Sequence, residues 1–196
     1  MSETRLDAGR QWRVGAVKSF RREGNALFLT CEGGLLRLAA LCSNCLRVTF
    51  NPDHRLTDMP SVAVVNMPSC EAFTVEPTDD RIMLRTDELT VVVAKEDTRI
   101  RISDSQGHVV SEDADGLTWG RRTVRCTKVM DEETHFYGLG EKTGFLDKRG
   151  RKYMMWNTDD PVHTPTKDPL YKSIPLLLCF NGKWATGTFV DYTGRI

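Results

Sequence analysis

The sequence predicts an all-β protein, folded as an antiparallel sandwich or barrel. Its apolar runs are short, residues typical of turns separate them, and no amphipathic pattern of helix length lies between them. Strands at this density are typical of a β-sandwich. The predicted strands of the first half are residues 26–31, 35–41, 45–50, 61–65, 72–75, 81–85, 89–94 and 99–103.

Turn-forming residues stand where these strands must reverse direction. The segment 98–103 alternates polar and apolar residues, so Ile100 and Ile102 are expected on one face of their strand. Glycine, serine, asparagine and aspartate favour turns because they tolerate or stabilise tight backbone conformations. The predicted turns are residues 33–34, 43–44, 79–80 and 105–108.

The chain closes with a second hairpin signal. Residues 174–180 are apolar, Asn181-Gly182 predicts a type I′ turn, and residues 183–190 return as a strand. Before this hairpin, residues 135–175 crowd glycines, aromatic residues, prolines and both charge signs together. Such a mixture favours a shaped, polar-edged loop on a scaffold. The prediction is one mainly antiparallel β-domain over residues 1–196 with a long inserted loop.

Composition argues against two classes of partner. The 196 residues include 27 basic and 27 acidic side chains, for a formal net charge of +0. A neutral balance gives no electrostatic attraction to nucleic acid or to an anionic membrane. No apolar run approaches the roughly 20 residues that span a bilayer, and the first twelve residues lack the pattern of a secretory signal. We therefore expect no nucleic acid, no membrane and a cytoplasmic location.

The cysteines and histidines do not predict a metal or cofactor site. Cys42 and Cys45 form a C-x-x-C pair, but zinc usually requires a second close pair and none follows. They are expected as turn thiols between two strands, although redox chemistry and metal chelation stay open. The four histidines are scattered, and Gly138-Leu139-Gly140 lacks the third glycine of a dinucleotide loop. These glycines are expected to permit a tight strand exit.

Residues 156–160 carry groups suited to binding a sugar. An aromatic ring packs on the C–H face of a sugar, while amide and carboxylate oxygens accept hydroxyl hydrogen bonds, as Trp156, Asn157, Asp159 and Asp160 would allow. A solvated turn capped by these side chains is the alternative. Adjacent residues of an extended chain point to opposite sides, so Asp159 and Asp160 are not expected to form a catalytic acid–base pair.

Four pieces of this segment carry a resemblance to a known family. They are F-Y-G-L-G-E-K at 136–142, L-D-K-R-G at 146–150, W-N-T-D at 156–159 and D-P-L-Y-K-S-I-P at 168–175, with G-T-F-V-D at 187–191 as a further match. The region resembles the part that precedes the catalytic barrel in the family 31 glycoside hydrolases, the α-glucosidase and α-xylosidase group.

The resemblance implies a β-supersandwich like galactose mutarotase, placed before a (β/α)₈ barrel. It implies that the nucleophile and the acid/base are aspartates of that barrel, so no catalytic residue is expected within residues 1–196. The sandwich is expected to lack its closing strands, and the fragment alone is expected to be inactive. The intact protein would be a retaining α-glucosidase-like enzyme acting on α-linked gluco-oligosaccharides, with the downstream barrel as a partner.

The resemblance also names a substrate contact. In the family, the aspartate of W-N-x-D contacts the sugar near the leaving-group side, which here is Asp159. Thr158 and Asp160 are weaker candidates, and the active-site loop is expected within about residues 141–170. By contrast, packing or surface roles are expected for Tyr137, Trp156 and Tyr171 and for Lys148, Arg149 and Arg151.

Two other functions stay open. The chain would be a stand-alone carbohydrate-binding or structural β-module if no barrel accompanied it. A mutarotase-type epimerase would need a histidine acid and a carboxylate base facing one pocket, and no such histidine pair is obvious. Missing closing strands would leave unpaired edges and an exposed apolar face, so self-association to a homo-oligomer, or a covering segment, is expected.

Overall fold

All regular structure in this computed structural model is β-strand within the described residues, which are 11–56, 60–121 and 123–196. The chain divides into two compact units. Unit 1 comprises Met1–Asp58 and Asn66–Val129, and unit 2 comprises Met59–Val65 and Met130–Ile196. Over the described ranges, no helix is long and apolar enough to cross a membrane. The all-β, antiparallel prediction is confirmed, while the single domain over 1–196 stays a prediction.

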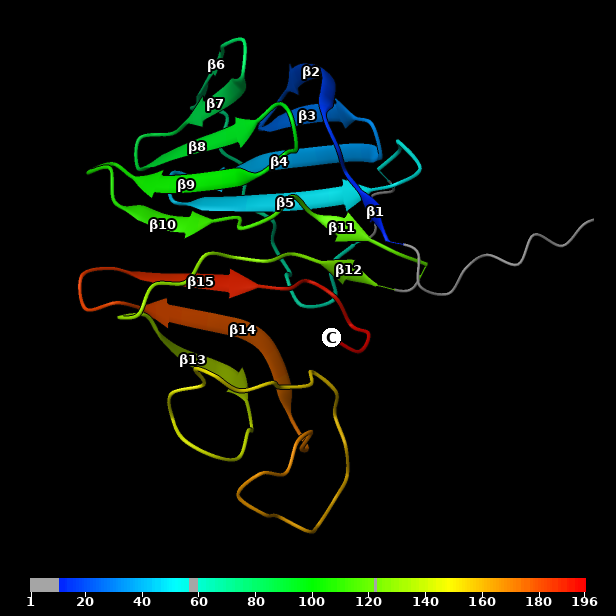
Figure 1. Cartoon of the computed structure of the whole chain (residues 1–196), viewed down its shortest axis with the longest axis vertical. Helices are drawn as coiled ribbons and strands as arrows, with labels where there is room; N and C mark the ends of the chain where they lie inside the picture. Colours follow the sequence, from blue (N-terminus) through cyan, green and yellow to red (C-terminus); the bar gives the residue numbers. More distant parts are fainter. Residues whose placement is uncertain (1–10, 57–59, 122) are drawn as a thin grey trace, which may run out of the picture. The chain divides into compact units, whose positions relative to one another are not determined.

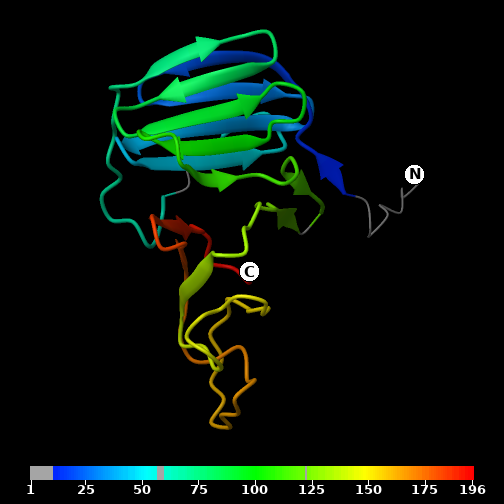
Figure 2. The ribbon, with the colours of Figure 1, turned by 60° about the vertical axis from the view of Figure 1, so that its left-hand side comes forward.

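Unit 1 is a sandwich of two main sheets, whose strands are all paired antiparallel. The first sheet has the order β2-β3-β4-β5 and the second the order β10-β9-β8-β7-β6 (Figure 1). In Figure 2 the blue and cyan strands of the first sheet lie behind the green strands of the second. The strands are β2 (Val17–Glu23), β3 (Ala26–Cys31), β4 (Gly34–Cys42), β5 (Cys45–Asn51), β6 (Thr74–Pro77), β7 (Arg81–Arg85), β8 (Leu89–Ala94), β9 (Ile100–Asp104) and β10 (Val109–Glu112).

The core of unit 1 lies between these two sheets. Alternate residues of a strand point to the same face, so β3 and β4 each present one row of leucines inward. Leu27 and Leu38 are opposite each other in the ladder and fully buried, as are Ile82 and Val93 across the β7–β8 pair. Each such side chain contributes about 1.5–3 kcal/mol through its burial.

A third, small sheet has the order β1-β11-β12, with β1 (Trp12–Arg13), β11 (Thr118–Trp119) and β12 (Val124–Arg125).

Most predicted strands of this unit are confirmed. The turns at 43–44, 79–80 and 105–108 join the predicted neighbours, and Ile100 and Ile102 both pack on the core. The strand predicted at 72–75 begins two residues later, as β6. The strand predicted at 61–65, a segment of unit 2, is wrong: Ser61 Oγ accepts the backbone N–H groups of Ala63 and Val64 at 3.2 and 2.9 Å, which bends the segment back on itself.

Unit 2 contains a three-stranded antiparallel sheet of order β13-β14-β15 (Figure 1). Its strands are β13 (His135–Gly140), β14 (Ser173–Phe180) and β15 (Ala185–Phe189). Residues 141–172 form the long loop between β13 and β14 and contain no strand. The type I′ turn predicted at Asn181-Gly182 is wrong. Four residues join β14 to β15, because Asn181 Oδ1 accepts the N–H groups of Lys183 and Trp184 at 3.1 and 3.2 Å.

Gly138 and Gly140 allow the last residues of β13 to lie close to the backbone of β14. Both have positive φ, at 98° and 81°, and the pairing register shifts between them. A Cβ atom at Gly138 would lie 2.5 Å from the Leu176 carbonyl oxygen. Only glycine fits so close to a neighbouring backbone, which confirms the expected role of this pair in the strand exit.

Candidate functional site

The buried side chain of Lys142 holds the long loop of unit 2 together. It has no exposed surface, and its Nζ donates to Asp168 Oδ1 at 2.8 Å, to the Met154 carbonyl at 2.6 Å and to Ser173 Oγ at 3.3 Å. The other carboxylate oxygen of Asp168 accepts the backbone N–H of Met154. Three separate parts of the loop and its flanks therefore meet at one ammonium group, whose three donors are all used.

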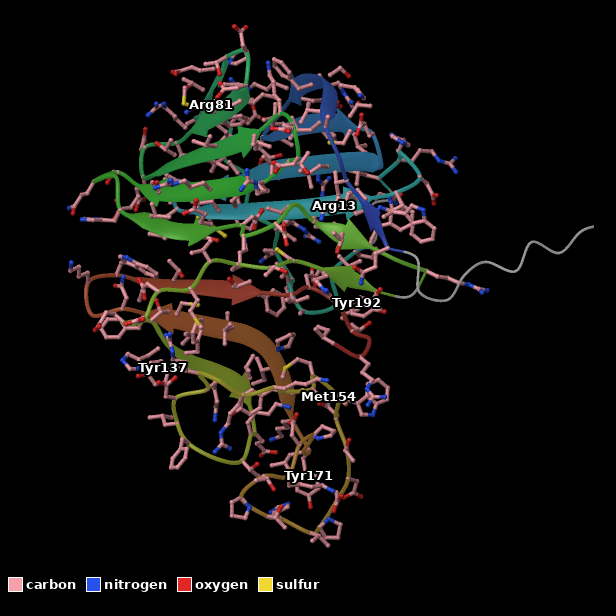
Figure 3. All side chains as sticks on the ribbon, viewed as in Figure 1. Arg13, Arg81, Tyr137, Met154, Tyr171 and Tyr192 are labelled. Atoms are coloured by element: carbon pink, nitrogen blue, oxygen red, sulfur yellow. The ribbon has the colours of Figure 1, made fainter. Side chains whose placement is uncertain are left out.

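Ser173, the first residue of β14, adds a second set of bonds next to Lys142. Its Oγ accepts the N–H of Trp156 at 3.0 Å and lies 3.0 Å from the carbonyl of the same residue, to which it can donate. Its own N–H donates to Asn157 Oδ1 at 2.8 Å. The residues directly before Thr158 and Asp159 are thus fixed to the sheet. Figure 3 labels Met154 and Tyr171, which lie on the outgoing and returning parts of this loop.

Asp147 organises the first part of the loop against β13. Its carboxylate accepts from His135 Nδ1 at 2.6 Å and from the N–H groups of Phe136 and Arg149, each at 3.0 Å. The pKa of Asp147 falls from 3.8 to about 2, first because of the His135 hydrogen bond and then because of these backbone donors. Lys148 is buried, and its Nζ donates to the Phe145 carbonyl at 2.8 Å, so it supports the loop rather than decorating its surface.

The three predicted substrate-contact residues have different surroundings. Asp160 forms an ion pair with Lys167 and accepts the N–H of Val162 at 3.0 Å. The hydrogen bond from Lys167 is the first cause that lowers the pKa of Asp160, followed by the Val162 N–H. Thr158 is half-buried and donates its N–H to the Leu170 carbonyl at 2.9 Å.

Asp159 differs from both neighbours. Its side chain is exposed, and it makes no hydrogen bond or ion pair with any described residue. The adjacent aspartates therefore do not share one environment: Asp160 closes the loop, and Asp159 faces solvent. Two such groups are not arranged as an acid–base pair across one bond, in agreement with the sequence-based reasoning.

Aromatic side chains are exposed along the same loop. Trp156 is 49% exposed and Tyr171 is 37% exposed, so each ring presents part of its surface to solvent. The His163 ring meets the Tyr171 ring edge-on at 5.4 Å between centroids. Phe145 is 74% exposed, with the Arg151 guanidinium 5.1 Å from its ring centroid. These rings supply the flat apolar surfaces that bind sugar faces.

A separate pocket of about 390 Å³ lies in unit 2, over one face of its sheet. Its lining is mostly apolar and includes Phe136, Leu177 and Val190 of the sheet side and Met155 of the long loop. The Tyr153 hydroxyl, from another lining residue, is buried and has no hydrogen-bond partner within residues 11–56, 60–121 and 123–196. None of Thr158, Asp159 and Asp160 lines this pocket, so it is distinct from the candidate sugar contacts.

Sequence reasoning missed Lys142, Asp168 and Ser173 as the residues that shape the site. All three occur in the matching motifs, but a lysine or an aspartate in a polar loop is usually solvated. The scattered charges gave no signal that one lysine would be fully buried. No group of three or more potential metal ligands occurs among the described residues, so the structure adds no metal centre to the prediction.

Comparison with known proteins gives the family. Residues 35–196 match the glycosyl hydrolase 31 N-terminal galactose mutarotase-like domain. This chain belongs to that family. The chain is also 37% identical over 183 residues to alpha-glucosidase 2 of Bacillus thermoamyloliquefaciens, a match that covers 92% of this chain and 23% of the relative. The predicted family resemblance and the mutarotase-like fold are therefore confirmed.

Solved structures agree with this assignment. A glycoside hydrolase family 31 dextranase of Flavobacterium johnsoniae, in complex with isomaltotriose, superposes with a TM-score of 0.81 at 25% identity, over 90% of this chain and 23% of that one. A cycloalternan-forming enzyme of Listeria monocytogenes has the same fold, with a TM-score of 0.73 at 18% identity over 87% of this chain and 17% of that one. The chain thus spans a quarter or less of the length of these relatives.

Proposed function

We propose that this chain is the N-terminal part of a retaining α-glucosidase-like enzyme that acts on α-linked gluco-oligosaccharides. The similarity to alpha-glucosidase 2 supports the enzyme class, and the isomaltotriose bound to the similar dextranase supports an α-linked glucose oligomer as substrate. In this proposal the nucleophile and the acid/base are aspartates of a barrel outside residues 1–196. One aspartate attacks the anomeric carbon, and water then releases the glycosyl-enzyme.

The role proposed for this chain is to orient the sugar on the leaving-group side through Asp159. The observation that carries this role is the difference between the two adjacent aspartates. Asp160 is occupied by Lys167 and by the backbone of Val162, whereas Asp159 is exposed and has no partner among the described residues. A carboxylate of this kind is able to accept hydrogen bonds from two sugar hydroxyls. The fixed backbone before it limits where those hydroxyls can lie.

The test is Asp159→Ala in the intact enzyme. A hydrogen bond to a charged group is worth about 1.5–3 kcal/mol, so kcat/KM for an α-linked glucose disaccharide is expected to fall about 10-fold to 150-fold. An aryl α-glucoside whose leaving group is not a sugar lacks those hydroxyls. Its kcat/KM is expected to change less than about 3-fold, because Asp159 contacts only the leaving-group sugar.

Asp79→Ala is the matched control, since Asp79 is also an exposed aspartate but lies in the β6–β7 turn of unit 1. This variant is expected to leave kcat/KM for both substrates unchanged. Equal losses on the two substrates for Asp159→Ala would contradict the leaving-group assignment. The isolated chain of residues 1–196 is expected to show no hydrolysis of either substrate, and turnover by the purified chain would contradict the placement of the catalytic aspartates outside it.

A further inference from the structure

Two cysteines lie at the two ends of the β4–β5 turn in unit 1. β4 ends at Cys42, β5 begins at Cys45, and the two residues are direct partners in the antiparallel ladder. Residues directly opposite in such a ladder have Cβ atoms about 4.5–5.5 Å apart. A disulfide needs about 3.5–4.5 Å between these atoms, so a small movement of the turn is enough to join them.

Both thiols of this turn are accessible. Cys42 and Cys45 are exposed, and Cys42 Sγ lies 3.2 Å from Asn44 Oδ1 within the turn. The pKa of Cys45 is raised, first by partial burial and then by the charge and hydrogen bonding of Cys42. All six cysteines are free thiols in this structure, and Cys42 and Cys45 face each other across one turn. Cys31, in comparison, is buried in the core.

The turn that carries this pair is held by the neighbouring β7–β8 turn. Ser43 Oγ donates to Glu88 Oε1, Asn44 Nδ2 donates to Glu88 Oε2 at 3.4 Å, and Thr86 Oγ1 donates to the Ser43 carbonyl. Both residues between the cysteines are therefore restrained from outside the hairpin. Restraint of this kind raises the effective concentration of one thiol at the other, because less chain entropy is lost when the bond forms.

We propose that Cys42 and Cys45 are a reversible redox pair that closes to a disulfide by exchange with a small-molecule disulfide. The Cys42 thiolate attacks one sulfur of that molecule, a mixed disulfide forms, and the other half leaves as a thiolate. The Cys45 thiolate then attacks Cys42 Sγ, the Cys42–Cys45 bond forms, and the second half leaves. The protein gives up two electrons and two protons, and one disulfide is reduced to two thiols. Cys42 is the entering thiol because the raised pKa of Cys45 leaves less of it as thiolate.

The experiment equilibrates the intact protein with mixtures of reduced and oxidised glutathione, followed by acid quench, alkylation and mass spectrometry. The tryptic peptide from residues 38–47 contains both cysteines and no others. In wild type this peptide is expected to become about 2 Da lighter when the disulfide forms, and both thiols are then protected from alkylation together. The disulfide is expected to form at about 10-fold lower oxidised glutathione in the folded protein than in the urea-unfolded protein, because the folded turn is preorganised. Cys45→Ser lacks the resolving thiol, so Cys42 is expected to retain one glutathione, a gain of about 305 Da.

Two variants separate this pair from general thiol oxidation. Cys70→Ser, at a half-buried cysteine outside the turn, is expected to leave the transition unchanged. Glu88→Ala removes the acceptor for Ser43 and Asn44 and is expected to shift the transition toward that of the unfolded chain. The proposal is overturned if both thiols of folded wild type stay open to alkylation, if folded and urea-unfolded protein oxidise at the same glutathione ratio, or if glutathione stays attached to wild type.

Discussion

Lys142→Met tests whether one buried charge sets the shape of the substrate loop. Methionine has a similar length but no donor, so it fills the space and removes all three hydrogen bonds of the ammonium. Asp168 would keep the Met154 N–H as a partner, and the Met154 carbonyl would lose its bond to the lysine. The variant therefore leaves a partly compensated charge in the interior of the loop.

The expected cost follows from the burial of the pair. Removal of one partner of a buried ion pair costs about 3–5 kcal/mol, because the other charge stays without compensation. Here the Asp168 side chain is 16% exposed and keeps one donor, so the lower end, about 3 kcal/mol, is the better value. If this cost falls on local opening of the loop, amide exchange in the loop should become about 150-fold faster.

Hydrogen exchange followed by mass spectrometry measures this directly. Peptides that cover the amides of Met154, Trp156 and Ser173 should exchange faster, because these amides donate to Asp168, Ser173 and Asn157. Peptides from β3 and β4 in unit 1 should be unchanged. Lys152→Met is the matched control, since Lys152 is an exposed lysine of the same loop.

Two results would refute the reasoning about Lys142. One is unchanged loop exchange in Lys142→Met, which would mean that the loop is held by other contacts. The other concerns the double variant Lys142→Met with Asp168→Asn. Since it also removes the partly compensated charge of Asp168, it should exchange more slowly than the single variant. A double variant that exchanges faster would show that electrostatics is not the cause.

Two further predictions concern unit 2. The pKa of Asp147 is lowered to about 2 from 3.8, so its carboxylate stabilises the fold fully above about pH 4, and this contribution is lost as the pH falls toward 2. The stability difference between wild type and Asp147→Asn, measured by urea unfolding, should shrink over that window, and a constant difference would contradict the assigned cause. Gly138→Ala should destabilise unit 2 by more than Gly182→Ala, because both positions have positive φ but only Gly138 has a backbone atom, 2.5 Å away, where the Cβ would lie. Gly182→Ala should cost about 1 kcal/mol from backbone strain alone, and equal costs for the two variants would contradict the close approach.

The sheets of unit 1 were largely predictable because their burial follows the period of the strand. Buried and half-buried residues alternate along β7 and β8, and the apolar runs mark these strands clearly. β2 was missed because nearly all residues of Val17–Glu23 are exposed. A strand of exposed residues contains no apolar run in its sequence. β13 was not predicted as a strand because two of its six residues are glycines, which weaken a strand pattern and were expected only at a strand exit.

The site was predictable only in part. The carboxylates of residues 159 and 160 identify hydrogen-bond acceptors, but composition does not say which of the two is occupied by the protein itself. That distinction comes from Lys167, seven residues further along the chain, which pairs with Asp160. The burial of Lys142 likewise results from tertiary contacts. It depends on contacts 12, 26 and 31 residues away, which no local pattern contains.

These contacts explain how a loop without regular structure can present one carboxylate reproducibly. Residues 141–172 contain no strand, so their shape depends on a few buried polar groups rather than on a ladder of backbone hydrogen bonds. Lys142 and Ser173 fix the chain just before Asp159, and Lys167 fixes it just after, through Asp160. Side chains of adjacent residues in extended chain point to opposite sides, so an inward Asp160 turns Asp159 outward. In the proposed function, Asp160 is therefore a positioning residue for Asp159: its replacement should disturb the loop, whereas replacement of Asp159 should leave the loop intact and remove only the contact with the sugar.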